Sequence, residues 1–144
     1  MGQRRVGGND EIEASQDGGR IDVAPGELLD KITILKIKAE NIADPDKLAN
    51  VRHELETLTA ARGAALPDSH ALDRLTADLK AVNARLWAIE DAIRACERAD
   101  DFGPAFIQLA RDVYRTNDRR AAIKRQVNDL LGAAIVEEKS YTAY

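Results

Sequence analysis

The stretch LDRLTADLKAVNARLWAIEDAIRAC, residues 72–96, decides the fold. Its apolar residues recur in alternating steps of 3 and 4 positions from Leu72 to Cys96, and neither Pro nor Gly interrupts them. This spacing places them in one stripe along an α-helix, as in the seam of a coiled coil. Because such a stripe is unstable when exposed to water, we expect other helices of the chain to cover it.

The composition favours a single helical domain. The chain has 144 residues, of which 44% are hydrophobic but only 4% aromatic, so its core must consist mainly of aliphatic side chains. Its net charge of −4 argues against non-specific binding to nucleic acid, which requires a basic surface, and we expect no nucleic-acid partner. The single cysteine, Cys96, excludes an intramolecular disulfide and suits a reducing compartment.

The partner of this stripe follows directly in the sequence. We expect a helix over about 69–99, a break at Asp100-Asp101-Phe102-Gly103-Pro104, and a second helix over about 104–137. Two helices of similar length joined by a short turn form an antiparallel hairpin. The stripe of the second helix turns polar in its middle, at Thr116 and Arg120, and polar residues on an apolar seam usually have a specific role.

Two shorter helices, over about 25–43 and 45–62, precede the hairpin and are expected to cover it, which makes the fold class all-α. They either lie along the hairpin one after the other or pair with each other at one end. The first arrangement leaves part of the hairpin bare and predicts a dimer. We expect one domain over 21–138, a disordered tail over 1–20 and a polar tail over 139–144.

The sharpest candidate site is an anion site on the second hairpin helix. Arg115 and Arg119, with Arg52 or Arg85 from neighbouring helices, have the guanidinium groups to hold a carboxylate or phosphate by forked hydrogen bonds. The alternative is structural. Asn117 then sets the helix register, and the arginines pair with carboxylates of the hairpin. These carboxylates are Asp118, Asp91 and Glu90.

Two further groups are candidates for ligand binding. Asp30 and Lys31 lie near the start of the first helix, where they either flank an anion-binding helix N-terminus or form local ion pairs. Trp87, Glu90 and Asp91 lie beside the seam, where paired carboxylates would need a neighbouring charge to act as acid and base.

No pattern in the sequence indicates a metal, a cofactor or a membrane span. His53 and His70 lack the neighbours that metal ligation requires, and no glycine-rich phosphate loop occurs. The apolar runs are far shorter than the ~20 residues of a membrane-spanning helix. The N-terminus lacks the apolar region of a signal peptide, so we expect a cytoplasmic protein.

Three motifs together resemble a known family. They are PGELLDKITIL at 25–35, LWAIEDAIR at 86–94 and YRTND at 114–118. The sequence from about 21 to 141 is similar to the bacterial family catalogued as domain of unknown function 6165. The resemblance implies a small helical bacterial protein and, loosely, an association with genes for lipopolysaccharide and other surface-glycan synthesis. Family members usually have Ser before the Pro-Gly-Glu motif, where this chain has Ala24, which cannot cap the first helix.

Two functional hypotheses follow. The first is a non-enzymatic helical interaction protein without catalytic residues. It would bind a second copy of itself or another helical partner. The second is a small helical enzyme or binding protein for an anionic metabolite, such as a carboxylate or sugar phosphate. The sequence favours the first, because it contains no catalytic constellation. A buried cluster of Arg115, Arg119 and a third cation would support the second, whereas arginines on the solvent surface would support the first.

Overall fold

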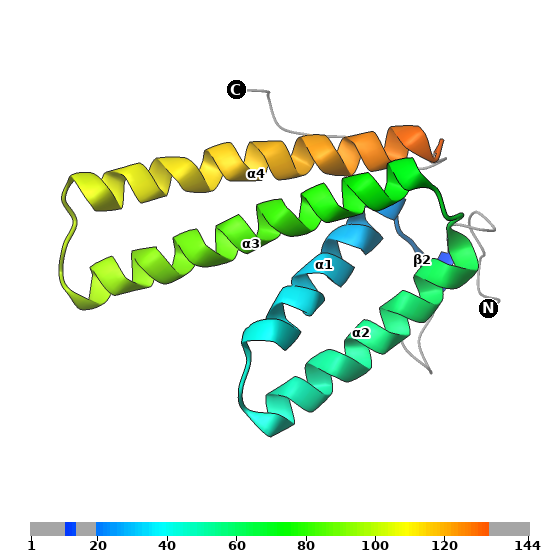
Figure 1. The fold of residues 1–144 in the computed structure, drawn as a ribbon, viewed down its shortest axis with the longest axis horizontal. Coiled ribbons are helices and arrows are strands. Elements are labelled where there is room, and N and C mark those ends of the chain that lie inside the picture. The colour runs from blue at the N-terminus through cyan, green and yellow to red at the C-terminus, as the bar shows by residue number, and fades with distance from the viewer. Residues whose placement is uncertain (1–10, 14–19, 133–144) are drawn as a thin grey trace, which may run out of the picture.

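The computed structural model describes residues 11–13 and 20–132, and within them the fold is helical, as the sequence predicts (Figure 1). The four helices in this part of the chain are α1 (Pro25–Asn41), α2 (Pro45–Ala65), α3 (His70–Arg98) and α4 (Pro104–Leu130). A small antiparallel pair of strands, β1 (Glu11–Glu13) and β2 (Arg20–Asp22), precedes them.

The helix starts follow the residues that cap them. The side chain of Asp44 accepts a hydrogen bond from the Asp46 amide at the start of α2, and that of Ser69 accepts one from the Leu72 amide at the start of α3. Pro25 occupies the first turn of α1, but Ala24 provides no side-chain cap, as expected.

The helix ends differ from the predicted ones, and α1 ends at Asn41 instead of at 43. Helix α2 continues through Gly63 to Ala65 instead of ending at 62, because its amide and carbonyl groups remain in the helical ladder. Helix α4 ends at Leu130, and Gly132 beyond it adopts a left-handed φ of 58°. Residues 133–137, which the sequence assigns to the same helix, lie outside the described residues.

Most of the two predicted tails lies outside the described residues, namely 1–10, 14–19 and 139–144. The described residues of the N-terminal tail are Glu11–Glu13 and Arg20. Glu11–Glu13 forms β1, which the sequence pattern did not indicate, and Arg20 begins β2. In the register of the pair, Ile12 lies opposite Ile21. The extended segment anticipated around Ile21 is thus present as β2.

Helices α3 and α4 form the predicted antiparallel hairpin, and α1 lies across one end of it in contact with both (Figure 1). Helix α2 pairs with α1, so the two short helices adopt the second of the two predicted arrangements. None of the residues of α2, all of which are described, is fully buried. Leu55 and Leu58 nevertheless pack against the edge of the core. Cover of the hairpin therefore comes mainly from α1, whereas the sequence predicts cover by both short helices.

The hairpin has two unlike halves. The core half comprises residues 70–83 and 116–130, and the tip half comprises residues 84–115. Among residues 84–115, all of them described, Ile89 alone is fully buried. The core half instead contains the fully buried hairpin side chains: Leu72, Leu79, Val82, Asn83, Thr116, Ile123 and Val127.

Gly26 allows α1 to approach α4 closely. A Cβ atom at this position would lie 2.5 Å from the backbone oxygen of Lys124, closer than two such atoms can pack. The Gly26 amide donates a hydrogen bond of 2.8 Å to the side-chain oxygen of Asn128. The Pro-Gly-Glu motif therefore fixes the position of α1 on the hairpin.

Candidate functional site

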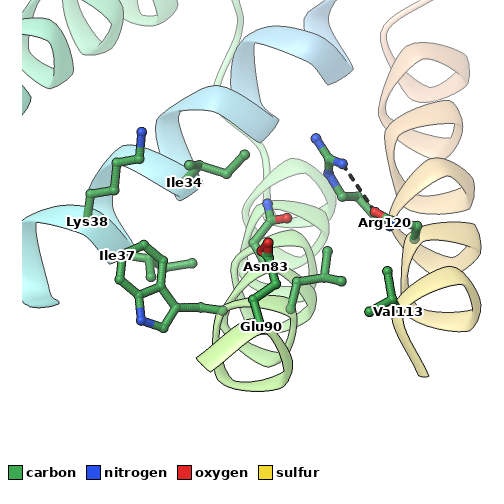
Figure 2. A pocket seen from close by; sticks show the side chains of 10 residues that line it. Ile34, Ile37, Lys38, Asn83, Glu90, Val113 and Arg120 are labelled. Carbon is green, nitrogen blue, oxygen red and sulfur yellow. Dashed lines mark hydrogen bonds between the residues drawn. The ribbon is translucent and has the colours of Figure 1, made fainter. Parts of the chain in front are cut away.

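A cleft of about 370 Å³ opens where α1 meets the middle of the hairpin (Figure 2). We call it the α1 cleft. This size falls in the range of pockets that bury ligands or anchoring side chains, about 300–1,000 Å³. Helices α1, α3 and α4 all contribute to its lining. The apolar lining residues are Ile34, Ile37, Leu86, Trp87 and Val113, and the polar ones are Lys38, Asn83, Glu90, Asn117 and Arg120.

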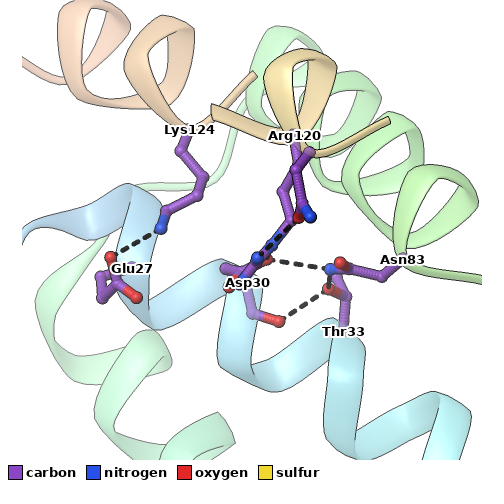
Figure 3. Close-up of polar contacts among 7 residues, drawn as sticks. Glu27, Asp30, Thr33, Asn83, Arg120 and Lys124 are labelled. Carbon is purple, nitrogen blue, oxygen red and sulfur yellow. Dashed lines mark hydrogen bonds and ion pairs between the residues drawn. The ribbon is translucent and has the colours of Figure 1, made fainter. Parts of the chain in front are cut away.

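The back of the α1 cleft is a buried polar network centred on Asp30 (Figure 3). Arg120 binds its carboxylate with two hydrogen bonds, from Nε to Oδ1 at 2.9 Å and from Nη2 to Oδ2 at 2.5 Å. Asn83 donates to Asp30 Oδ1 and to the Thr33 hydroxyl, both at 2.9 Å. The Thr33 hydroxyl donates to the backbone oxygen of Asp30 at 2.8 Å. One carboxylate on α1 therefore connects α3 and α4.

The electrostatics of this network favour its charged state. Burial by itself would raise the pKa of Asp30, but hydrogen bonds from Arg120 and Asn83 and the positive charges of Arg120 and Lys124 hold it below its usual value. The hydrogen bond to Asp30 in turn raises the pKa of Arg120. Because each group is already bonded to the other, the pair is suited to holding helices together rather than to exchanging protons.

A second groove, of about 540 Å³, lies between α3 and α4 without a contribution from α1. Arg85 and Arg119 line it together with Asp78. Arg85 Nη2 also lies 3.9 Å from Asp112 Oδ2. The groove therefore brings together two of the arginines proposed for an anion site, with carboxylates close to them.

The match to a family model covers almost all of this architecture. The model described as a family of unknown function, DUF6165, matches residues 19–144. The chain belongs to the DUF6165 family. No curated protein and no solved structure matches the chain. The family resemblance predicted from the sequence motifs is thus confirmed, and the α1 cleft and its polar network lie within the matched residues.

The predicted candidates of this DUF6165 member divide into separate groups in the structure. Trp87, Glu90 and Asn117 line the α1 cleft, whereas Asp30 does not line it but binds Arg120, which does. Lys31 is exposed and pairs with Glu54 of α2 at 3.3 Å.

The remaining candidates lie outside the α1 cleft. Asp91 pairs with Arg94 on the surface of α3 at 3.2 Å. Arg115, Asp118 and Arg119 are exposed on α4, and of these Arg119 alone lines the second groove. Arg52 is exposed on α2. The structure therefore does not bring Arg115, Arg119 and a third cation together in a buried cluster.

The sequence pattern correctly singled out the polar middle of α4 but not its partner. Arg120 binds Asp30 of α1, whereas the predicted carboxylate partners of the arginines were all on the hairpin. Asn117 accepts a hydrogen bond of 3.3 Å from Arg120 Nη1 and so orients the guanidinium. Sequence reasoning missed Thr33 and Asn83, although a polar residue directly beside the seam, as Asn83 is, signals a buried partner.

Neither a group of metal ligands nor a membrane-spanning helix occurs among the described residues. Within residues 11–13 and 20–132, no three His, Cys, Asp or Glu side chains are grouped as metal ligands. None of the helices in this part of the chain has the length and apolar character to span a bilayer.

Proposed function

We propose that this protein is a non-catalytic helical interaction module that binds a second copy of itself through the tip half of the hairpin. The observation that carries the proposal is the contrast in burial between the two halves. Among the described residues, three of the four exposed large apolar side chains lie in the tip half: Phe102, Ile107 and Tyr114, at 49%, 56% and 55% exposed. The fourth, Leu130, lies in the core half and is 45% exposed. Large apolar side chains grouped on one part of a surface mark sites of association.

The physical reason is that two helices alone cannot bury their shared seam. In the core half α1 provides a third element, and the seam residues Leu79 and Val127 are completely buried. In the tip half the seam residues Leu86, Leu109 and Val113 remain partly exposed. Helices of a second chain would provide the missing cover and complete a bundle.

The chemistry of the α1 cleft supports a binding role rather than catalysis. Its strongest charged groups, Asp30 and Arg120, are bonded to each other and connect three helices. No nucleophile with an adjacent base lies among its described lining residues, which an acyl- or group-transfer enzyme would need.

The cellular setting we propose comes from the family resemblance alone. It is the bacterial cytoplasm, with an enzyme of surface-glycan synthesis as a further partner of the dimer. Affinity capture from the native host tests this point. Recovery of such an enzyme by the wild-type chain, and its loss with a tip variant, would support it; recovery of none would contradict it.

Size-exclusion chromatography with light scattering tests self-association directly. We expect a concentration-dependent dimer, with slowed hydrogen exchange in residues 84–115 as the dimer forms. Residues 70–83 should exchange slowly in both states and provide the internal control. A strict monomer at high concentration would contradict the proposal.

The second groove favours one alternative function, the binding of an anionic metabolite between Arg85 and Arg119. A thermal-shift screen of carboxylates and sugar phosphates tests it. A stabilising compound whose effect disappears in Arg119→Ser but persists in the exposed control Arg125→Ser would support this alternative. A screen without such a compound would contradict it.

A further inference from the structure

We propose that the hairpin tip of one chain inserts into the α1 cleft of a second copy, and that a two-fold axis makes the contact reciprocal. This inference rests on the self-association proposed above and assigns the surfaces that meet. The tip is defined by Phe102 and Phe106, and the receptor is the α1 cleft.

The tip presents a preformed aromatic knob. Phe102 and Phe106 are the two phenylalanines of the chain, and their rings meet edge to face with centroids 5.3 Å apart. Phe102 is nevertheless half exposed, so the pair gains little burial within its own chain. Rigid, exposed aromatic side chains are typical anchors of protein interfaces.

The α1 cleft offers a matching surface. Ile34, Ile37 and Trp87 give it an apolar wall, and the ion pair behind it is already satisfied. An aromatic side chain can therefore enter without removing a partner from a buried charge.

The knob and the cleft lie on the same side of the hairpin. Phe106 precedes the cleft residues Val113 and Asn117 by 7 and 11 positions, spacings that return to one face of an α-helix. At the rise of an α-helix the two sites are separated by roughly 10–17 Å along α4.

This placement allows two identical tip-in-cleft contacts to form between two chains. In Figure 1, α1 diverges from the hairpin towards its own C-terminal end, and no described helix lies against the far end of the hairpin, where α3 and α4 are joined. A second hairpin lying antiparallel beside the first would place its tip in the first cleft and its cleft over the first tip. Because the two contacts are identical, the assembly ends at a dimer instead of growing into a filament.

The charges around the two surfaces are complementary at Lys38, although one carboxylate, Glu90, also lines the cleft. Lys38 lines the cleft, and within the described residues no carboxylate pairs with it. Asp100 and Asp101 directly precede Phe102 at the tip. Insertion of the tip would bring these carboxylates towards Lys38 of the other copy, which favours this partner and orientation.

Removal of the knob is the first test. We expect Phe102→Ala to raise the dimer dissociation constant about tenfold or more, because the substitution acts at both contacts. Leu130→Ala is the matched control, since Leu130 is similarly exposed, at 45%, but lies in the core half, outside the proposed contact. It should change the constant less than about threefold. Circular dichroism of both variants verifies that the helices are intact.

Disulfide trapping is the second test. In a Cys96→Ser background, chains with Lys38→Cys and chains with Ala99→Cys should form few covalent dimers separately. Mixed together and oxidised, they should form a covalent heterodimer, because position 38 of one chain meets the tip of the other. Chains with Lys47→Cys, an exposed position on α2, should not cross-link to the Ala99→Cys chains.

The outcomes separate this inference from the proposed function. A dimer that Phe102→Ala leaves unchanged, or that Ile107→Ala or Tyr114→Ala weakens more, would refute the tip-in-cleft contact while self-association remains. A strictly monomeric wild-type chain would refute both.

Discussion

The two halves of the hairpin share one sequence pattern but differ in structure. The apolar stripe continues unbroken from Leu72 to Cys96, yet it is buried mainly up to Val82. The difference arises because α1 has 17 residues whereas α3 has 29, so α1 covers one end alone. A regular stripe thus predicts a helix and the face that needs a partner. Whether that partner belongs to the same chain depends on the length and direction of the other elements.

The polar residues also differ between the two halves in their burial and their partners. Asp30, Asn83 and Arg120 are buried or half-buried in the core half, where each finds a partner on another helix. In the tip half the charged groups remain on the surface, as the Asp91–Arg94 pair does. The polar interruption of α4 therefore marks the place where a third helix arrives.

The largest effect is expected from breaking the core half at its ion pair. Asp30→Ala should lower the free energy of unfolding by about 3–5 kcal/mol, because it leaves the Arg120 guanidinium partly buried without its counter-charge. Urea denaturation followed by circular dichroism measures the change. Lys31→Ala, which removes the exposed pair with Glu54, is the control and should cost about 1 kcal/mol or less. Equal losses in the two variants would show that the buried network is not what joins the helices.

An intermediate effect on stability is expected from two substitutions that compare the halves directly. Leu79→Ala, at a completely buried seam position, should cost about 3 kcal/mol, whereas Leu109→Ala, at a partly exposed one, should cost about 1 kcal/mol. Both are measured at a concentration where the chain is monomeric. If Leu109→Ala were as costly as Leu79→Ala under these conditions, the tip half would already be covered within one chain.

The smallest effect concerns the pH dependence of the core half. The folded pKa of Asp30 lies below its unfolded value of about 3.9, so its ionisation stabilises the fold above that pH, and this contribution is lost as the pH falls through the folded pKa. The stability difference between the wild type and Asp30→Asn should therefore be constant near neutral pH and shrink in acid. Urea denaturation at a series of pH values measures it. A difference that grows in acid would contradict the assigned direction.

Much of the fold could be predicted from local patterns. The breaks at Asp44-Pro45 and at Gly103-Pro104 separate the helices because proline and capping residues act within one turn. The same reasoning located the middle of the hairpin as the place to expect a site, and Trp87, Glu90 and Asn117 do line the α1 cleft there. It did not find Asn83, whose partners Asp30 and Thr33 lie about 50 residues away in the sequence, or Thr33, whose role depends on that same contact.

The sequence by itself determined the helical class, the hairpin and the apolar stripe, because helix periodicity and turn chemistry act over a few residues. The tertiary structure alone decided that α1 and α2 pair at one end and that Arg120 binds Asp30. The approach of α1 to α4 at Gly26 depends on a backbone contact between residues about 100 positions apart, which no local pattern records. That contact leaves the tip half of the stripe uncovered, where the sequence alone showed one continuous seam.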